Sequence, residues 1–544
     1  MITLYDTTLR DGSQSEGINF TVRDKLRITQ LLDEFGLPMI EGGWPGSNPK
    51  DVEYFRQVRE LKLKQTRVTA FGATCRPKSS PAEDPNIVAL IEAETPVVTV
   101  VGKSWTRHVT QVLQTDLDNN LRIIEQSLAH LAAAGREVIF DAEHFFDGYA
   151  TDADYAMATL TAAVAGGAGT LVLCDTNGGM LPWQVAETVE AVRAQIDTPL
   201  GIHAHNDSGC AVANSLAAVH AGCTHVQGTI NGFGERCGNA DMCALAANLE
   251  LKLGQKVLPD GRLAGITELS RRVSEMVNVP HPRNAPYVGR SAFAHKGGIH
   301  VAAIQRDDGS YEHVDPETVG NARRVLVSEL SGKGSMRMKL VDFGLDDSDK
   351  HVLKTVLERI KELENRGFAF EAAEASVELM IRRERPDWRP FFELMDFMVV
   401  VEHREGRGLL AEANTKLRIG GDVYHTAADG VGPVDALDHA LRKALMEVYP
   451  GVQNFRLTDY TVRILDAHLA TEAVTRVLVE TTDGHDTWTT VGASQNIIEA
   501  SWQAVKDSID FGLMRSGVEA PVASAVEGPA ASAVEAPTEG ESGN

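Results

Sequence analysis

Cysteine is scarce in this chain: there are six among 544 residues, and no two are spaced as a CxxC pair. This scarcity argues against a disulfide framework or a structural zinc site and favours reduced thiols in the cytoplasm. Long apolar runs are absent as well, since no stretch approaches the roughly 20 apolar residues of a membrane-spanning helix. Residues 1–6 contain neither the basic nor the apolar region of a signal peptide. We therefore expect a cytoplasmic protein without a membrane partner.

Basic residues are outnumbered by acidic ones, 52 Lys and Arg against 76 Asp and Glu, which gives a formal net charge of −24. Nucleic acids and anionic membranes require a basic surface, so neither is expected as a partner. Five glutamates lie in residues 516–544, which lack Lys and Arg and repeat a Val-Glu-Ala/Gly-Pro pattern every eight residues. Proline interrupts helices, and Ala, Ser and Gly supply little apolar surface. Residues 515–544 are therefore predicted to be a disordered acidic tail.

Short β-rich segments alternate with amphipathic segments in the first half of the chain. Their starts are about 25 to 40 residues apart, which leaves room for a strand, a loop and a crossover helix. Eight such units in about 255 residues predict a (β/α)8 TIM barrel. Residues 10–13 also lack the GxGxxG pattern that a doubly wound dinucleotide-binding sheet would carry. The predicted strands are 2–5, 38–41, 67–71, 97–101, 137–140, 170–174, 200–204 and 225–228.

Polar residues follow almost every predicted strand, at the end where barrels of this kind hold their active sites. His203 and His205 are two apart on a predicted strand, so their side chains point to the same face. Asp11 lies just beyond the first strand and Asn239 beyond the eighth, and these strands are neighbours in a closed barrel. The four side chains are thus predicted to bind a divalent cation. Their mixed nitrogen and oxygen donors leave Zn, Mn, Co and Mg open.

Other polar residues at the strand ends are candidates for substrate chemistry. Arg10, beside Asp11, could bind an oxyanion or pair with an acidic residue of the same ring of strand ends. Glu143 ends the fifth strand and is the better general-base candidate there, whereas Asp141 is expected on the strand itself. Thr176 is either a substrate contact or an ordinary turn residue.

Three segments at these strand ends resemble a known enzyme family. They are Asp6-Thr-Thr-Leu-Arg-Asp-Gly-Ser-Gln14, His203-Ala-His-Asn-Asp207 and Gly228-Thr-Ile-Asn-Gly-Phe-Gly-Glu-Arg-Cys-Gly-Asn239. In this order they are similar to the 2-isopropylmalate, homocitrate and citramalate synthases, whose wider superfamily includes hydroxymethylglutaryl-CoA lyase. Residues 41–51, 141–148 and 173–179 resemble the citramalate branch in particular. The resemblance extends from residue 1 to about residue 514.

The resemblance implies a role for each matching residue. The implied metal ligands are Asp11, His203, His205 and Asn239. The implied catalytic residues are Arg10, Glu143, His300 and Tyr311, and the implied substrate contacts are Arg10, Gln14 and Thr176. Taken by themselves, His300 and Tyr311 are two polar residues in a Gly-rich region outside the barrel. Glu143 and His300 both remain candidates for the base.

The implied reaction is a Claisen-type condensation of acetyl-CoA with pyruvate. A base removes a methyl proton from acetyl-CoA, and the enolate attacks the keto carbonyl of pyruvate, which the metal and Arg10 polarise. Hydrolysis of the thioester then gives citramalate and CoA, in isoleucine biosynthesis. The alternatives are an isopropylmalate or homocitrate synthase acting on a larger 2-oxo acid, a metal-dependent acyl-CoA lyase, and a non-catalytic amino-acid-binding regulator.

Three parts are predicted before the acidic tail of residues 515–544. Residues 1–275 form the catalytic barrel, and residues 276–390 form a helical linker subdomain with a mobile loop. Residues 391–514 form an α/β domain, with strands expected at 396–402, 460–464 and 477–480 and helices at 433–446 and 497–508. This domain resembles the regulatory domain of the family, with isoleucine as the expected effector. The alternative is a domain that only dimerises, and a homodimer is expected in either case.

Overall fold

The computed structural model describes residues 2–304, 306–328, 333–345, 350–406, 408–465 and 472–521. These residues form two compact units. The first comprises residues 2–294 and 312–324, and the second comprises 295–311 and the described residues from 325 onwards. The predicted linker is thus divided between the two units. Most of the predicted tail, residues 522–544, lies outside the described residues.

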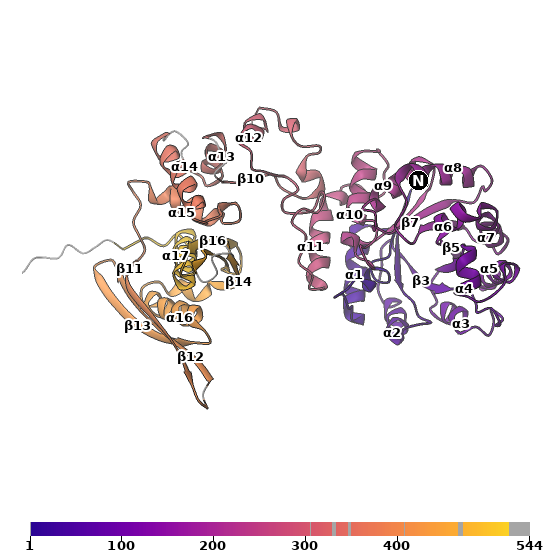
Figure 1. Cartoon of the computed structure of the whole chain (residues 1–544), viewed down its shortest axis with the longest axis horizontal. Helices are drawn as coiled ribbons and strands as arrows, with labels where there is room; N and C mark the ends of the chain where they lie inside the picture. Colours follow the sequence, from indigo (N-terminus) through magenta and orange to yellow (C-terminus); the bar gives the residue numbers. More distant parts are fainter. Residues whose placement is uncertain are drawn as a thin grey trace, which may run out of the picture. The chain divides into compact units, whose positions relative to one another are not determined.

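The first unit is a closed barrel of eight parallel strands that follow one another in chain order around the barrel. Helices surround the strands (Figure 1). All eight predicted strands are present, and each begins within one residue of its predicted start, so the predicted barrel is confirmed. The strands are β1 (Thr3–Asp6), β2 (Met39–Gly43), β3 (Arg67–Ala73), β4 (Val97–Lys103), β5 (Glu137–Glu143), β6 (Thr170–Asp175), β7 (Leu200–Ala204) and β8 (His225–Gly228).

The first helix, α1 (Val22–Phe35), illustrates why the segments between strands become helices. The Asp24 N–H donates to Thr21 Oγ1 at 3.2 Å, and the Thr21 N–H donates to Asp24 Oδ2 at 2.9 Å. Gly36, with φ of 105°, ends the helix in the left-handed conformation that glycine tolerates best. The other helices of this unit are α2 (Pro49–Val58), α3 (Pro85–Glu92), α4 (Thr106–Gln111), α5 (Leu117–Ala133), α6 (Phe145–Thr151), α7 (Ala153–Ala165), α8 (Pro182–Arg193), α9 (Ala211–His220), α10 (Met242–Leu251) and α11 (Ile266–Met276).

The capping box of α1 leads to a stability prediction. Thr21→Ala removes the side-chain acceptor at the helix start and should destabilise the barrel by about 1 kcal/mol. For a unit of this size the expected change is a fall of about 2 °C in the melting temperature of the barrel, measured by calorimetry. Thr21→Ser keeps the acceptor and should melt as the unchanged protein does. Equal melting temperatures for Thr21→Ala and Thr21→Ser would contradict a capping role.

The second unit contains two similar segments, each made of a three-stranded antiparallel sheet followed by a helix. The sheets are β11-β12-β13 and β14-β15-β16, and buried residues of both sheets and of the two helices form one core. The elements of the segments are β11 (Glu393–Arg404), β12 (Gly408–Ile419), β13 (Asp422–Gly430), α16 (Pro433–Met446), β14 (Arg456–Ile464), β15 (Thr475–Thr482), β16 (Thr487–Ser494) and α17 (Ile497–Arg515). The preceding elements are β9 (Ala294–His295), α12 (Gly298–Ile304), β10 (Arg324–Val325), α13 (Lys333–Asp342), α14 (Lys350–Asn365) and α15 (Glu374–Arg383).

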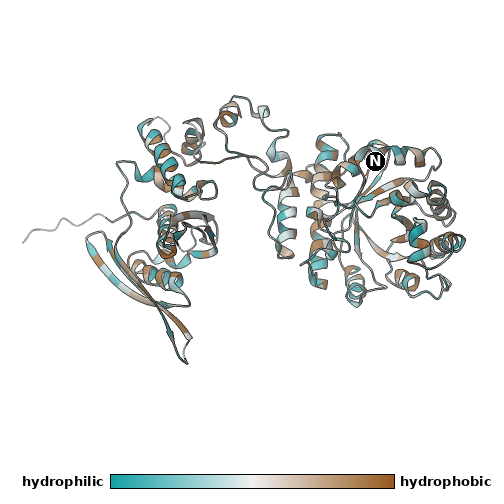
Figure 2. Ribbon diagram, viewed as in Figure 1, coloured by the Kyte–Doolittle hydropathy of each residue, from teal (hydrophilic) through white to brown (hydrophobic). Residues whose placement is uncertain are grey.

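The α/β character predicted for this region is confirmed, but the sequence prediction omitted β12, β13 and β16. Along β12, buried residues such as Ala413 and Leu417 alternate with exposed ones such as Lys416 and Arg418. Bands of hydrophilic and hydrophobic residues accordingly alternate along the ribbons of this sheet (Figure 2). The last helix also continues beyond the predicted end, to Arg515. Among the helices of the described part of the chain, none has the length and apolar character that crossing a membrane requires.

Candidate active site

The predicted site residues of the barrel, except Asn239, line a cavity of about 380 Å³ at the carboxyl ends of the strands. Asp11 and Arg10 come from the turn after β1, Glu143 from the end of β5, and His203 from β7. The cavity is lined, among others, by Arg10, Asp11, Gln14, Glu143, Thr176, His203 and His205. One cavity thus brings together seven of the residues that the sequence singled out.

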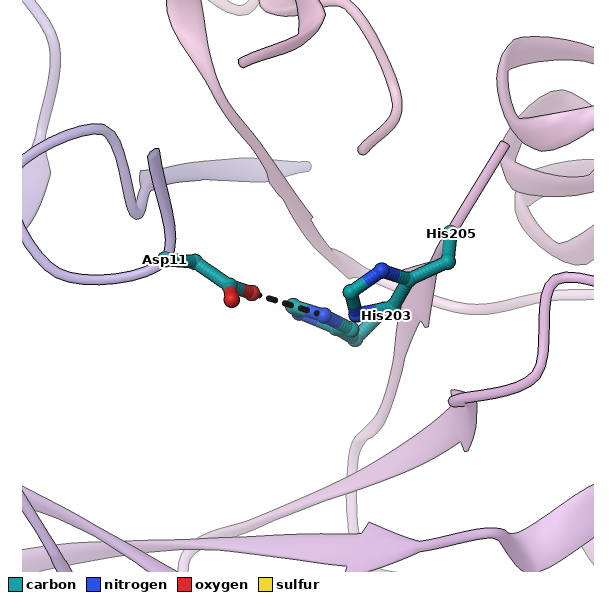
Figure 3. Close-up of side chains that lie close together, drawn as sticks. All are labelled: Asp11, His203 and His205. Atoms are coloured by element: carbon teal, nitrogen blue, oxygen red, sulfur yellow. Dashed lines mark ion pairs between the residues drawn. The ribbon is translucent and has the colours of Figure 1, made fainter. Parts of the chain in front are cut away.

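Asp11, His203 and His205 form a cluster in which one ligand atom of each residue lies within 4.8 Å of the others (Figure 3). His203 Nε2 is 3.1 Å from Asp11 Oδ2. Asn239, the fourth predicted ligand, donates from Nδ2 to Asp11 Oδ2 at 2.8 Å and lies 3.2 Å from His203 Nε2. All four side chains are buried. The closure of the barrel between β1 and β8 therefore brings the four predicted ligands together.

The chemistry of these donors fits a divalent cation. Burial alone would raise the pKa of Asp11, but Arg10 and His203 outweigh it and hold that pKa well below its usual value. Burial and the neighbouring His203 lower the pKa of His205 to about 4, so its imidazole is neutral, as coordination requires. Among the described residues, His205 Nδ1 and Asn239 Oδ1 are buried without a hydrogen-bond partner. Buried donors and acceptors are rarely left unpaired, so these two atoms fit a site that coordinates a cation.

Gln227, on β8, orients His203 and was not identified from the sequence. His203 Nδ1 donates to Gln227 Oε1 at 2.7 Å, and Gln227 Nε2 donates to Asp141 Oδ1 at 3.1 Å. This pairing leaves His203 Nε2 free to face Asp11. Asp141 lies on β5, as predicted, and burial together with the charge of Glu41 raises its pKa to about 7. The only sequence signal for Gln227 is a polar residue inside a short buried strand.

Removing the amide of Gln227 should weaken metal binding. Groups that orient a coordinating imidazole typically contribute 10- to 100-fold to metal affinity, so Gln227→Leu should raise the dissociation constant by that factor. Titration of metal-free protein, followed by calorimetry, measures the change. Gln195→Leu, in the loop after α8, serves as the control and should bind metal normally. Unchanged affinity in Gln227→Leu would show that His203 is oriented without this hydrogen bond.

Arg10 pairs with two acidic residues, which is one of the two roles considered from the sequence. Its Nε donates to Glu41 Oε1 at 2.5 Å, its Nη1 is 3.2 Å from Asp11 Oδ1, and its guanidinium lies 3.8 Å from the centroid of Phe71. Burial alone would lower the pKa of Arg10, but Asp11 and Glu41 raise it above its usual value. Glu41 is itself fully buried and accepts a hydrogen bond from the Tyr5 hydroxyl at 2.7 Å. Arg10 is therefore held in one orientation at the cavity, with part of its edge still available.

Glu143 pairs with Lys103, whose strand β4 is the neighbour of β5. The two residues are aligned in the register of these strands, and Lys103 Nζ contacts Glu143 Oε2. Both side chains are about one-quarter exposed and line the cavity. This pairing was not predicted, because a single sequence does not reveal the register between neighbouring strands.

Thr176 and Gln14 also reach the cavity. Thr176 Oγ1 accepts a hydrogen bond from the His144 N–H at 2.9 Å, so the hydroxyl hydrogen remains available to another acceptor. His144 adopts φ of 55° and contacts Asp147 Oδ2 through Nδ1 at 3.1 Å. Gln14 is exposed at the end of the turn after β1.

His300 and Tyr311 belong to the second unit. Their rings are stacked, with centroids 4.2 Å apart and planes inclined by 23°. The two residues are thus neighbours of each other. Their participation in the site of the barrel remains a prediction from the resemblance.

Comparison with known proteins agrees with the fold. Residues 1–273 match the HMGL-like family, residues 287–367 the homocitrate synthase post-HMGL domain-like family, and residues 371–513 the LeuA allosteric (dimerisation) domain. The barrel and its cluster of buried donors thus define an enzyme of the HMGL-like class, with a LeuA-type C-terminal domain.

The full-length relatives define the family more narrowly. The (R)-citramalate synthase of Aquifex aeolicus is 50% identical, over 95% of this chain and 99% of its own length. The (R)-citramalate synthase of Geobacter sulfurreducens is 51% identical, over 95% and 98%. A probable 2-isopropylmalate synthase of Methanopyrus kandleri is 32% identical, over 92% and 96%. The chain belongs to the family of (R)-citramalate synthases.

Proposed function

We propose that the chain condenses acetyl-CoA with pyruvate and hydrolyses the thioester, giving citramalate and CoA. The observation that carries this proposal is the identity of 50–51% to two (R)-citramalate synthases over 95% of the chain. The cluster of buried ligands beside Arg10 supports it, because a cation and a guanidinium together suit an anionic 2-oxo acid.

The residues that would hold the cation are Asp11, His203, His205 and Asn239. A divalent cation in this position supplies Lewis acidity for a carbonyl oxygen. Arg10 binds the carboxylate of pyruvate through the donors that Glu41 and Asp11 leave free. The mixed nitrogen and oxygen donors are compatible with Zn, Mn, Co and Mg.

Glu143, His300 and Tyr311 are proposed to carry out the proton transfers. Glu143 or His300 removes a proton from the acetyl methyl group, and the new carbon–carbon bond joins that carbon to the keto carbon of pyruvate. The keto oxygen takes up a proton and becomes the hydroxyl of the product. Tyr311 is a candidate donor of this proton. Thr176 and Gln14 are proposed to contact substrate from the cavity wall. Water then cleaves the thioester to a carboxylate and the CoA thiol.

A thiol-release assay tests the proposal. Metal-replete protein should release CoA from acetyl-CoA with pyruvate, and a chelator should abolish the release. Re-addition of a divalent cation should restore it, and nuclear magnetic resonance should identify the product as citramalate. Absence of CoA release with any 2-oxo acid would overturn the proposal.

A synthase acting on a larger 2-oxo acid is the second candidate, supported by the 32% identity to the probable 2-isopropylmalate synthase. The same assay distinguishes this function from citramalate synthesis. A larger specificity constant with 2-oxoisovalerate than with pyruvate would favour the synthase for a larger 2-oxo acid. The lyase alternative predicts the reverse reaction, release of acetyl-CoA from a hydroxyacyl-CoA.

We also propose that residues 371–513 form a regulatory homodimer domain that binds isoleucine. The match to the LeuA allosteric (dimerisation) domain supports this, and so does the exposed apolar surface of β11 at Met398 and Val400. Light scattering should give twice the mass of 58.9 kDa. Saturating isoleucine should lower the initial rate, whereas inhibition by leucine alone would overturn the assignment of isoleucine as the effector.

A cytoplasmic location is proposed as well, which the six free cysteines support.

A further inference from the structure

The segment that follows β2 forms a wall of the cavity to which the proposed reaction assigns no role. Trp44 and Phe71 both line the cavity. Their rings meet edge to face, with centroids 5.3 Å apart and planes inclined by 81°. Phe71 is buried, and its ring lies directly against the guanidinium of Arg10. Trp44 is therefore the second layer of an aromatic wall that begins at the residue proposed to bind the 2-oxo acid.

The orientation of Arg10 places a bound 2-oxo acid beside this wall. Phe71 covers one face of the guanidinium, Glu41 occupies Nε, and Asp11 lies near Nη1. A carboxylate can then bind only to the remaining edge, on the side of the cavity. Trp44, which contacts Phe71, lines the same cavity and is therefore available to contact the substituent of such an acid.

Buried charges anchor Trp44 in this position. Its backbone N–H donates to Asp51 Oδ2 at 2.9 Å, and Asp51 pairs with the buried Lys25, which also donates to the Gly42 carbonyl at 3.0 Å. The indole Nε1 donates to Asn86 Oδ1 at 3.3 Å. An indole held at both its backbone and its ring nitrogen cannot easily move aside for a larger ligand.

Gly43 allows the approach of the Asp51 carboxylate. It adopts φ of 152°, and a Cβ at this position would lie 2.5 Å from the carboxylate carbon of Asp51. The Gly-Gly-Trp sequence therefore serves to place one large ring at the cavity.

Small residues make up other parts of the lining, among them Ala73, Gly102 and Cys174, and Trp44 is the largest side chain that reaches the cavity. We propose that Trp44 sets the upper size limit for the substituent of the 2-oxo acid. This inference rests on the proposed function, since it concerns the choice among 2-oxo acids at the same site. One extra methylene in a pocket of this kind changes discrimination by roughly 10- to 200-fold.

Specificity constants for pyruvate, 2-oxobutanoate and 2-oxoisovalerate test the inference. In Trp44→Ala and Trp44→Phe, the ratio of kcat/KM for 2-oxoisovalerate to that for pyruvate should rise, by at least about tenfold in Trp44→Ala. The change should come mainly from a lower KM for the larger acid. Trp44→Phe keeps an aromatic ring and the backbone bond to Asp51, so it remains informative if Trp44→Ala does not fold. Trp183→Phe, on α8 with its side chain 59% exposed, is the control and should leave the ratio unchanged.

The inference would be overturned if, in folded Trp44→Phe and Trp44→Ala, the ratio of kcat/KM for 2-oxoisovalerate to that for pyruvate stays within about twofold of the ratio in the unchanged protein. The effect of a methylene group predicts a much larger change. That outcome leaves the proposed function intact, because the unchanged protein still releases CoA with pyruvate. If the unchanged protein releases no CoA with any of the three acids, the proposed function itself fails.

Discussion

Asp11→Ala should reduce CoA release by more than about 10³-fold while the barrel remains folded. Lewis-acid stabilisation contributes several kcal/mol to a transition state, and about 1.4 kcal/mol corresponds to a factor of ten. The Asp11 carboxylate is the centre of the cluster, since its two oxygens contact Arg10, His203 and Asn239. Its loss leaves two imidazoles and an amide, which bind a divalent cation far more weakly.

Two measurements and a control variant distinguish this explanation from unfolding. Metal content by mass spectrometry should fall with the activity, and the circular dichroism spectrum should stay unchanged. Asp118→Ala, an exposed position in the first turn of α5, should retain both metal and activity. Full activity and metal content in Asp11→Ala would remove Asp11 from the set of ligands.

Glu143→Gln should lower kcat by about 10²- to 10⁴-fold, the range that general-base catalysis contributes. The substitution keeps the size of the side chain and removes its ability to accept a proton. The KM for pyruvate should change little, because Arg10 rather than Glu143 is proposed to bind its carboxylate. Exchange of deuterium into the methyl group of acetyl-CoA should slow in parallel, which identifies the affected step as proton removal.

Glu137→Gln is a matched control for this experiment. Glu137 begins the same strand that Glu143 ends, and it is exposed and paired with Arg67. This variant should retain full activity. If Glu143→Gln retains the exchange reaction and His300→Ala loses it, His300 is the base and Glu143 has another role.

The barrel could be predicted because its strands are buried on both sides and read as short apolar runs with polar ends. Residues 97–101 and 170–174 are of this kind, and the observed strands differ little from the predicted ones. The strand β12 escaped prediction for the opposite reason. One face of its sheet is exposed, so charged residues such as Lys416 and Arg418 interrupt the apolar pattern.

The cluster of four donors could likewise be inferred from chain order, since closure of a barrel makes its first and last strands neighbours. The hydrogen-bond and ion-pair partners of these residues could not be inferred from chain order. The bond from His203 to Gln227 and the contact of Lys103 with Glu143 depend on register and on side-chain rotamers. The buried ion pair of Arg10 and Glu41 could not be predicted either, because Glu41 in the sequence resembles any other polar residue at the end of a strand.

The hydrogen bond between Asp11 and Asn239 joins residues 228 positions apart. During synthesis, the turn that carries Asp11 therefore leaves the ribosome long before its partners exist. No fragment that ends before β8 can assemble the cluster, and the early chain cannot retain a cation through it. Capture of the proposed cation would thus be a late event in biogenesis, and by mass action it would stabilise only those molecules whose barrel has closed.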